Sequence, residues 1–319
     1  MKQLGVLVFL LALPVFAQQD QNVETAPKLA YQVIPNFFKL PPNVYMAQAI
    51  AVAVDPKGDI WVGNRGNHPL MEFGQDGHYM GSLADGSSMF EAPHAIRFDP
   101  QGDLWYIDAG ADLVVEFDPQ KRIQMVLGTQ PEAWTYLTHV VQYAVRAGEN
   151  FYQPTDVTWD KAGDIFVTDG YGNSRVVKFD KDGNLLKYWG DRGTNPGQFN
   201  TPHSIVTDNQ GKIYVDDRGN SRIQVFDSNG ELLHLWHYPH PPWSLCITPG
   251  EHQVIYVGSI NQVYKIDLNG KELGWFGKPG RGPEDFNWVH AVACPNENTV
   301  YAAQELSWRV LKIELTSNQ

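Results

Sequence analysis

The sequence has little of what several classes of protein require. Its 319 residues include only two cysteines, Cys246 and Cys294, which could form one disulfide or remain as two buried thiols. Lys and Arg number 24 against 36 Asp and Glu. The resulting net charge of −12 argues against a nucleic-acid partner, which would favour a basic patch. No run of like charge and no low-complexity linker divides the chain, which indicates a single domain.

Long apolar runs are also missing, apart from a short one at the start of the chain. Residues 1–17 combine a basic start, a short apolar stretch and a Val-x-Ala end, which is typical of a secretory signal peptide cut after Ala17. The stretch is too short for a membrane span, and a signal anchor is the alternative. Residues 18–29 form a polar leader. We therefore expect an exported protein, periplasmic or secreted.

What the chain does contain is a repeat. A tight Gly-containing turn followed by an alternating apolar strand occurs at residues 55–62 (DPKGDIWV), 99–106 (DPQGDLWY), 160–167 (DKAGDIFV) and 208–215 (DNQGKIYV). Looser copies begin at Thr248 and Pro295. A spacing of 40 to 61 residues with short strands predicts propeller blades, one four-stranded sheet each. Six copies predict an all-β, six-bladed propeller.

The two ends of the chain bear on how this ring closes. The sixth repeat ends after residues 311–315 without a fourth strand, and the segment at residues 30–38 has no partner of its own. We expect this N-terminal segment to complete the last blade and close the ring, which removes an exposed sheet edge. The domain then covers residues 30–319. Residues 131–150 are an insertion between blades two and three, either a lid or a packed surface helix.

Three histidines share one register in the repeats. The residue five positions before each turn is Ile50, His94, Thr155, His203, Trp243 and His290 in blades one to six. Alternate blades therefore carry His at the start of the innermost strand, and a closed ring places these imidazoles about 120° apart. Polar residues lining a wet channel are the alternative reading. Three imidazoles converging on one point instead predict a zinc site with an open fourth position.

A second register lies ten residues after the same turn position. It contains Arg65 in blade one, Arg218 in blade four, and Gly170 followed by Tyr171 in blade three. Two arginines at the mouth of the channel suit an anionic substrate, because guanidinium binds carboxylate in a forked geometry. Surface ion pairs are the alternative for each arginine. A nearby arginine is expected to lower the pKa of Tyr171 and so make it a general base.

Four motifs resemble one known family. They are residues 151–157 (FYQPTDV), 168–177 (TDGYGNSRVV), 196–204 (PGQFNTPHS) and 216–226 (DDRGNSRIQVF). These segments are similar to peptidyl-α-hydroxyglycine α-amidating lyase, an NHL-type six-bladed propeller. The resemblance covers nearly all of the mature chain. It implies zinc on His94, His203 and His290, a catalytic Tyr171, and active-site arginines Arg65 and Arg218, which are the residues that the two registers select.

The resemblance also implies a structural calcium ion. Its ligands would be the backbone carbonyls of Val52 and Ile96 and an aspartate directly after the third histidine. Ala291 occupies that position in this sequence. Loss of the carboxylate argues against calcium, because this hard cation prefers charged oxygen ligands.

The predicted activity is zinc-dependent cleavage of the C–N bond in an α-hydroxyglycine-type carbinolamide, which gives an amide and glyoxylate. The substrate would be a peptide or small molecule with a carboxylate, ureidoglycolate-like compounds included, and the enzyme a monomer without a membrane span. Two alternatives remain: a metal-dependent hydrolase of the lactonase type, and a non-catalytic NHL-repeat binding scaffold.

Overall fold

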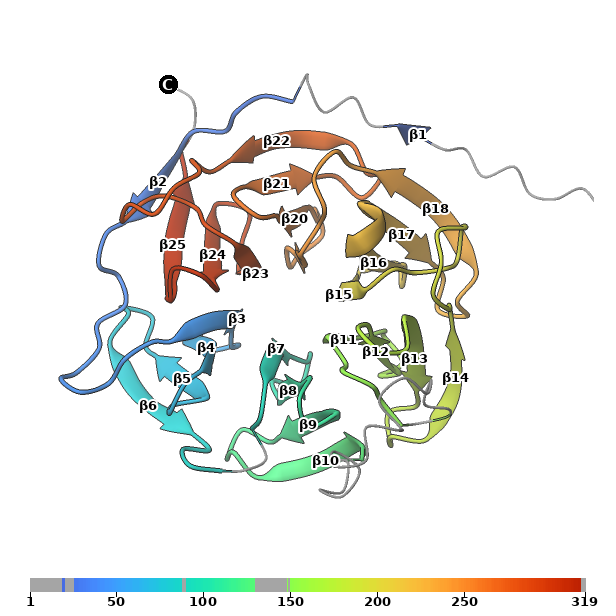
Figure 1. Ribbon diagram of the computed structural model, residues 1–319, viewed down its shortest axis with the longest axis horizontal. Helices are drawn as coiled ribbons and strands as arrows, with labels where there is room; N and C mark the ends of the chain where they lie inside the picture. The colour runs from blue at the N-terminus through green and yellow to red at the C-terminus, as the bar shows by residue number, and fades with distance from the viewer. Residues whose placement is uncertain (1–18, 21–25, 88–89, 130–147, 149, 317–319) are drawn as a thin grey trace, which may run out of the picture.

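Six sheets are arranged around a central axis in the computed structural model of the chain (Figure 1). The structure describes residues 19–20, 26–87, 90–129, 148 and 150–316. Within each sheet the blade strands pair antiparallel in meander order. This arrangement confirms the predicted six-bladed β-propeller. Over the described ranges, no helix is long and apolar enough to cross a membrane.

Within each of the first three blades the strands follow one another in chain order, from the innermost strand at the axis to the outermost. Blade one contains β3 (Gln48–Val54), β4 (Ile60–Arg65), β5 (Leu70–Phe73) and β6 (Tyr79–Leu83). Blade two contains β7 (Pro93–Phe98), β8 (Leu104–Asp108), β9 (Leu113–Phe117) and β10 (Ile123–Gly128). Blade three contains β11 (Asp156–Trp159), β12 (Ile165–Asp169), β13 (Arg175–Phe179) and β14 (Leu185–Trp189).

The remaining blades complete the ring. Blade four contains β15 (Pro202–Thr207), β16 (Ile213–Asp217), the short 3₁₀ helix η2 (Arg218–Asn220), β17 (Arg222–Phe226) and β18 (Leu232–His237). Blade five contains β19 (Ser244–Ile247), β20 (Ile255–Gly258), β21 (Val263–Ile266) and β22 (Glu272–Phe276). Blade six contains β23 (Val289–Ala293), β24 (Thr299–Gln304), β25 (Arg309–Leu315) and, as its outer strand, β2 (Tyr31–Ile34).

The repeated turn between the first and second strands has a simple physical basis. The Asp55 carboxylate accepts hydrogen bonds of 2.9 Å from the backbone N–H groups of Lys57 and Asp59. Gly58 adopts φ +92°, a left-handed conformation that glycine tolerates without steric cost. The turns that open with Asp99, Asp160 and Asp208 repeat the same pair of carboxylate–backbone bonds. The repeat therefore encodes a side-chain-capped hairpin in each of these four blades.

The apolar residues that the structure describes form six separate cores, and each lies between two neighbouring blades. One cluster combines Val62 and Phe73 of blade one with Tyr301 and Val310 of blade six, so the first and last blades pack directly on each other. The other five clusters lie at the other blade interfaces. Each sheet packs against a neighbouring blade on both of its faces. Both faces are therefore apolar, except at the axis and at the outer rim of the ring.

The N-terminal segment contacts both of these blades. β2 pairs antiparallel with β25, with Tyr31 opposite Leu315. A few residues later, the Lys39 N–H donates a 2.8 Å hydrogen bond to the carbonyl of Gly77, in the β5–β6 turn of blade one. Further upstream, β1 (Gln19–Asp20) pairs parallel with β18 and adds a fifth strand to blade four.

A disulfide joins Cys246 on β19 to Cys294, directly after β23. It links blades five and six covalently, which resolves the two alternatives that the sequence left for these cysteines. The signal peptide at residues 1–17 lies outside the described residues, as does the insertion at residues 131–150 apart from positions 148 and 150. Both stay predictions.

Candidate metal centre and channel mouth

The three register histidines meet at the axis of the ring. His94, His203 and His290 lie near the starts of the innermost strands β7, β15 and β23. Their ring centroids are 4.6 to 5.0 Å apart, and they offer one nitrogen each, all within 4.8 Å of one another. Each residue is only 2–3% exposed. This group could hold a metal ion.

A local irregularity of the strands aims each imidazole inwards. The pairing of β7 with β8 skips from Pro93 to Ala95, so His94 is the extra residue of a β-bulge. The same skip occurs around His203 and around His290. A bulge turns its extra residue away from the regular alternation of the sheet. All three side chains therefore point towards the axis rather than into a blade interface.

The histidine tautomers are fixed by the alternate blades. Each Nδ1 atom faces a backbone carbonyl oxygen, with distances of 2.7 Å for His94–Thr155, 2.6 Å for His203–Trp243 and 2.7 Å for His290–Ile50. A carbonyl oxygen only accepts, so each Nδ1 carries the proton and donates it. The three Nε2 atoms then carry the lone pairs that can bind a metal. Histidines that bind a metal through one ring nitrogen commonly donate a hydrogen bond from the other nitrogen in this way, which fixes the tautomer and the ring orientation.

The electrostatic environment keeps the imidazoles neutral. Burial, assisted by the nearby charges of Arg65 and Arg218, lowers the pKa of His94 from 6.5 to about 3. Burial likewise holds the pKa values of His203 and His290 well below the ordinary histidine value. Neutral imidazole is the form that binds metal, so the protein alone prepares the site for a cation.

Tyr171 lies directly over this trio. Its hydroxyl is 3.1 Å from Nε2 of His94 and 3.1 Å from Nε2 of His203. Because both nitrogens are acceptors, the phenolic O–H can donate to only one of them at a time. The structure thus brings the tyrosine selected from the sequence next to two of the three predicted ligands.

The expected lowering of the Tyr171 pKa by arginine is present, but it does not prevail in the protein alone. Burial raises this pKa above its ordinary value of 10.0, and it outweighs the opposing effects of Arg218 and Arg65. Glu305 raises the pKa further. Tyr171 is therefore a neutral phenol at neutral pH in the protein alone.

A rigid turn presents Tyr171 to the channel. The Asp169 carboxylate at the end of β12 accepts hydrogen bonds from Asn173 and Arg175, and the Arg175–Asp169 ion pair is almost completely buried. A Cβ at Gly170 would lie 2.0 Å from the Pro202 carbonyl oxygen, so only glycine allows blades three and four to approach here.

Arg218 is presented by the equivalent turn of blade four. Asp217 accepts hydrogen bonds from Asn220 and Arg222 in the same pattern as the turn of blade three. The Arg218 guanidinium lies 4.2 Å from the ring centroid of Trp243 and 5.3 Å from that of Tyr171. The repeated Asp-x-x-(x)-Asn-Ser-Arg motif thus positions two predicted site residues on neighbouring blades.

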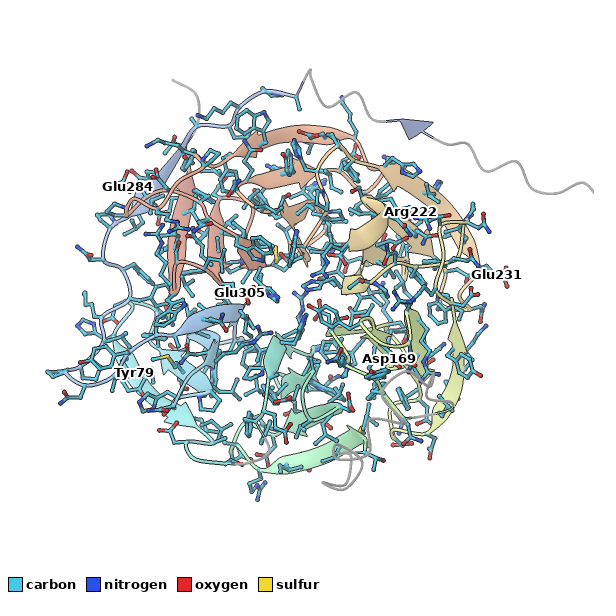
Figure 2. All side chains as sticks on the ribbon, in the orientation of Figure 1. Tyr79, Asp169, Arg222, Glu231, Glu284 and Glu305 are labelled. Carbon is cyan, nitrogen blue, oxygen red and sulfur yellow. A yellow bond between two sulfur atoms is a disulfide. The ribbon has the colours of Figure 1, made fainter. Side chains whose placement is uncertain are left out.

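Arg65 occupies the other side of the channel mouth, at the end of β4. Its Nε donates to the Pro93 carbonyl at 3.2 Å, and its Nη1 is 3.1 Å from a carboxylate oxygen of Glu305. Figure 2 shows Glu305 near the middle of the ring. Sequence reasoning missed this residue, although it stands ten positions after Pro295 and so belongs to the register that contains Arg65 and Arg218.

The chain matches the NHL repeat at residues 151–179 and 199–226. It is 31% identical over 189 residues to human NHL repeat-containing protein 3, and the matched region covers 56% of this chain and 51% of that protein. It is 31% identical over 137 residues to a probable peptidyl-α-hydroxyglycine α-amidating lyase of Caenorhabditis elegans, covering 42% and 36% of the two chains. The third relative is a peptidyl-glycine α-amidating monooxygenase of Xenopus laevis, 28% identical over 206 residues, with coverages of 55% and 22%.

The chain therefore contains NHL repeats within a six-bladed propeller, and its resemblance to amidating lyases is confirmed at moderate identity. It spans about half the length of the NHL relative and about a fifth of the monooxygenase. A gluconolactonase of Xanthomonas campestris has a similar fold, with a TM-score of 0.67 and 14% identity over 94% of both chains. Virginiamycin B lyase of Staphylococcus aureus gives a TM-score of 0.61 with 13% identity, over 91% of this chain and all of that one. These two likenesses concern the fold alone.

Proposed function

We propose that the protein is a zinc-dependent carbon–nitrogen lyase. Its substrate would be a carbinolamide of the form R-CO-NH-CH(OH)-COO⁻, and its products an amide and glyoxylate. The observation that carries the proposal is the position of the Tyr171 hydroxyl, 3.1 Å from two imidazole nitrogens of a three-histidine group. The relatives named as amidating lyases support this reaction class.

His94, His203 and His290 would hold the zinc through Nε2. When bound, zinc supplies a Lewis acid that polarises the substrate hydroxyl and lowers its pKa. The carbonyls that accept from the three Nδ1 groups keep the rings in orientation throughout turnover. Three protein ligands leave room for the substrate, as catalytic zinc sites do.

Tyr171 would move the proton. Tyr171 is a neutral phenol in the protein alone, and the positive charge of a bound zinc ion would add to that of Arg218 in favouring its phenolate. The phenolate would take the hydroxyl proton of the carbinolamide, the O–H electron pair would form the carbonyl of glyoxylate, and the C–N bond would break. The amide nitrogen leaves with the C–N electron pair and takes up one proton, which Tyr171 can return. Arg218 stabilises the phenolate, because its charge is the largest influence that opposes the raised pKa of Tyr171.

Arg65 would bind the substrate carboxylate. In the structure its guanidinium pairs with Glu305, and the Arg65 side chain is 28% exposed. A substrate carboxylate that approaches from the mouth can replace Glu305 as the partner of this forked donor. Glu305 therefore competes with the substrate for the same guanidinium.

The test is release of glyoxylate from a synthetic N-acyl-α-hydroxyglycine by zinc-loaded protein, with and without chelator. A reaction without protein measures spontaneous breakdown. A urea-type carbinolamide and a sugar lactone are assayed in parallel. We expect chelator-sensitive glyoxylate release from at least one carbinolamide. Folded, zinc-loaded protein that hydrolyses only the lactone would identify a hydrolase, and one that turns over neither compound would leave a binding scaffold.

We also propose that the protein works as a monomer outside the cytoplasm. The signal-type sequence at residues 1–17 and the Cys246–Cys294 disulfide support export, because disulfides persist in oxidising compartments. Mass spectrometry of the mature protein would give its first residue and its thiol content, and gel filtration its size. An N-terminus at Met1 on the cytoplasmic protein would contradict export.

A further inference from the structure

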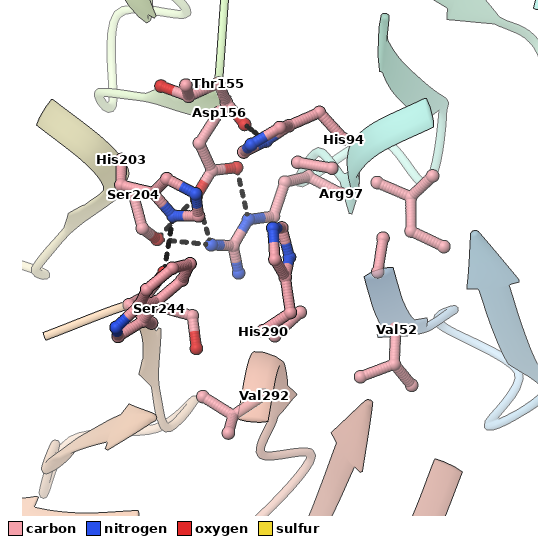
Figure 3. Close-up of a pocket in the computed structure, with 15 residues that line it drawn as sticks. Val52, His94, Arg97, Thr155, Asp156, His203, Ser204, Ser244, His290 and Val292 are labelled. Atoms are coloured by element: carbon pink, nitrogen blue, oxygen red, sulfur yellow. Dashed lines mark hydrogen bonds and ion pairs between the residues drawn. The ribbon is translucent and has the colours of Figure 1, made fainter. Parts of the chain in front are cut away.

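One arginine lies inside the channel and takes no part in the proposed chemistry. Arg97 follows His94 by three residues on β7, and its guanidinium projects into the cavity that the three histidines also line (Figure 3). It forms a two-point ion pair with Asp156, with an Nε–Oδ1 distance of 2.9 Å. Its Nη2 atom also donates to the Ser204 hydroxyl at 3.1 Å and to the Leu245 carbonyl at 3.0 Å.

These contacts connect four blades through a single side chain. Arg97 belongs to blade two, Asp156 to blade three, Ser204 to blade four and Leu245 to blade five. The Ser204 hydroxyl donates to Asp156 at 2.6 Å and accepts the Leu245 N–H at 3.0 Å, so its hydrogen-bonding capacity is filled. Each partner stands on an innermost strand. The network therefore joins these blades at their edges nearest the axis.

The same cavity is where the family resemblance would place calcium. Val52, Ile96 and Ala291 all line it. Asp156 is the only acidic residue among the described residues that line the cavity, and its charge is already neutralised by Arg97. A calcium ion there would find neutral ligands and a neighbouring guanidinium, which repels it. The residues of this chain do not fit calcium.

We propose that Arg97 replaces a structural cation in this propeller. Its guanidinium supplies a permanent positive charge in the cavity and bridges blades two to five. It is a positioning residue, because it holds the strands that carry His94 and His203 at a fixed separation. The protein consequently folds and binds its catalytic metal without calcium. This inference concerns the metal and the fold, and it holds whichever substrate the enzyme cleaves.

The first experiment compares Arg97→Met and Arg97→Lys with Lys178→Met. Lys178 is a matched control: it is a buried cation that pairs with Asp164 at 2.8 Å and donates to the Ser228 carbonyl of blade four, but it lies on the third strand of blade three. The readouts are the thermal midpoint of unfolding and the affinity for Zn²⁺ and Co²⁺. The visible spectrum of the Co²⁺ protein additionally reports ligand geometry.

We expect Arg97→Met to lower the unfolding midpoint by roughly 5–10 °C, because it leaves the Asp156 carboxylate buried and unpaired. It should also weaken Zn²⁺ binding about 10- to 100-fold, the usual effect of losing a group that supports metal ligands, and shift the Co²⁺ spectrum. Arg97→Lys keeps the charge but only one nitrogen, so it should recover part of both losses. Lys178→Met should lower the midpoint and leave metal affinity unchanged. An Arg97→Met protein with the metal affinity and spectrum of the wild type would overturn the positioning role.

The second experiment tests calcium directly by equilibrium dialysis of zinc-saturated protein against calcium, followed by metal analysis. We expect no bound calcium in the wild type and none in Ala291→Asp, whose new carboxylate would pair with Arg97. The double variant Arg97→Met, Ala291→Asp should bind one calcium ion and gain thermal stability from it. Stoichiometric calcium in the wild type, or no calcium in a folded double variant, would refute the replacement. Neither readout needs lyase activity, so failure of the proposed reaction would leave this test intact.

Discussion

At the scale of single residues, the candidate metal site results from an alternation of residues around the ring. Blades two, four and six contribute imidazoles, whereas blades one, three and five contribute the carbonyls of Ile50, Thr155 and Trp243, which stand at the same register position. One repeat position therefore has two roles that depend on the blade. In blades one, three and five the backbone carbonyl, and not the side chain, accepts the hydrogen bond from the histidine. Three dissimilar residues can therefore occupy this position.

Tyr171→Phe isolates the proton-transfer step. The ring keeps its packing while the hydroxyl that faces His94 and His203 is lost. We expect kcat to fall about 10²- to 10⁴-fold, the usual contribution of a general acid–base group, with zinc content unchanged. Steady-state glyoxylate release and metal analysis on the same preparation measure both effects. Turnover at the wild-type rate would exclude the tyrosine from the reaction.

Glu305→Gln tests the competition for Arg65. The glutamine keeps the size of the side chain but removes the charge that pairs with the guanidinium at 3.1 Å. The KM for a carboxylate-bearing substrate should fall roughly two- to fivefold, because a partly exposed ion pair of this kind contributes up to about 1 kcal/mol. The inhibition constant of glyoxylate should fall with it. Arg65→Gln is the opposing variant and should raise both constants; a higher KM in Glu305→Gln would mean that Glu305 orients Arg65 instead.

At the scale of elements, the strands and their order follow from the sequence because each turn is encoded locally. The Asp-x-x-Gly hairpins place the first two strands of four blades without reference to the rest of the molecule. The bulges at the three histidines are not visible in this way, since a bulge depends on how two strands pair. The contacts of Arg97 were also unpredictable, because they join residues up to 148 positions apart. Glu305, in contrast, could have been found by extending the second register to blade six.

The outer strand of blade five contains a carboxyl group without a hydrogen-bond partner among the described residues. Glu272 on β22 is 8% exposed, and neither carboxylate oxygen is bonded. Burial raises its pKa from 4.5 to about 7. The folded protein therefore holds this proton more tightly than the unfolded chain does. Stability is full below about pH 4.5 and decreases as the pH rises towards 7, because the charged form must be buried.

Glu272→Gln should remove this dependence. Near pH 5 the variant and the wild type should unfold at similar temperatures, whereas near pH 8 the variant should be more stable by about 1–2 kcal/mol, or roughly 3–6 °C. Thermal unfolding at several pH values measures the difference. Glu251→Gln, at an exposed turn position, is the control and should change neither curve. Parallel pH profiles of Glu272→Gln and the wild type would contradict the assignment.

At the scale of the whole molecule, a propeller of this size must keep six wedge-shaped interfaces closed at once. Three features of the described residues, among other polar contacts, link blades beyond their apolar cores. Arg97 bridges blades two to five at the axis, the Cys246–Cys294 disulfide joins blades five and six, and the N-terminal segment touches blades six and one. Taken in order, they connect every neighbouring pair except blades one and two. A metal site built from alternate blades, as the three histidines would form, needs such links, because any opening of the ring separates the ligands.

Closure by the N-terminal segment stays a prediction, and Phe38 offers its sharpest test. Its ring lies 4.9 Å from Phe73 of blade one and 6.2 Å from Tyr301 of blade six, measured between centroids. Phe38→Ala should reduce the free energy of unfolding by about 2–4 kcal/mol, as truncation of a largely buried aromatic does. Tyr45→Ala, 74% exposed in the same segment, should change it by less than about 0.5 kcal/mol.

Native-state hydrogen exchange distinguishes ring opening from general weakening. If the segment closes the ring, Phe38→Ala should accelerate exchange mainly in the strands of blades one and six, and His290 on β23 should be the first metal ligand to be released. Zinc affinity should then decrease together with the protection of these two blades. Uniformly faster exchange over all six blades would show that Phe38 stabilises the whole fold and does not specifically hold blades one and six together.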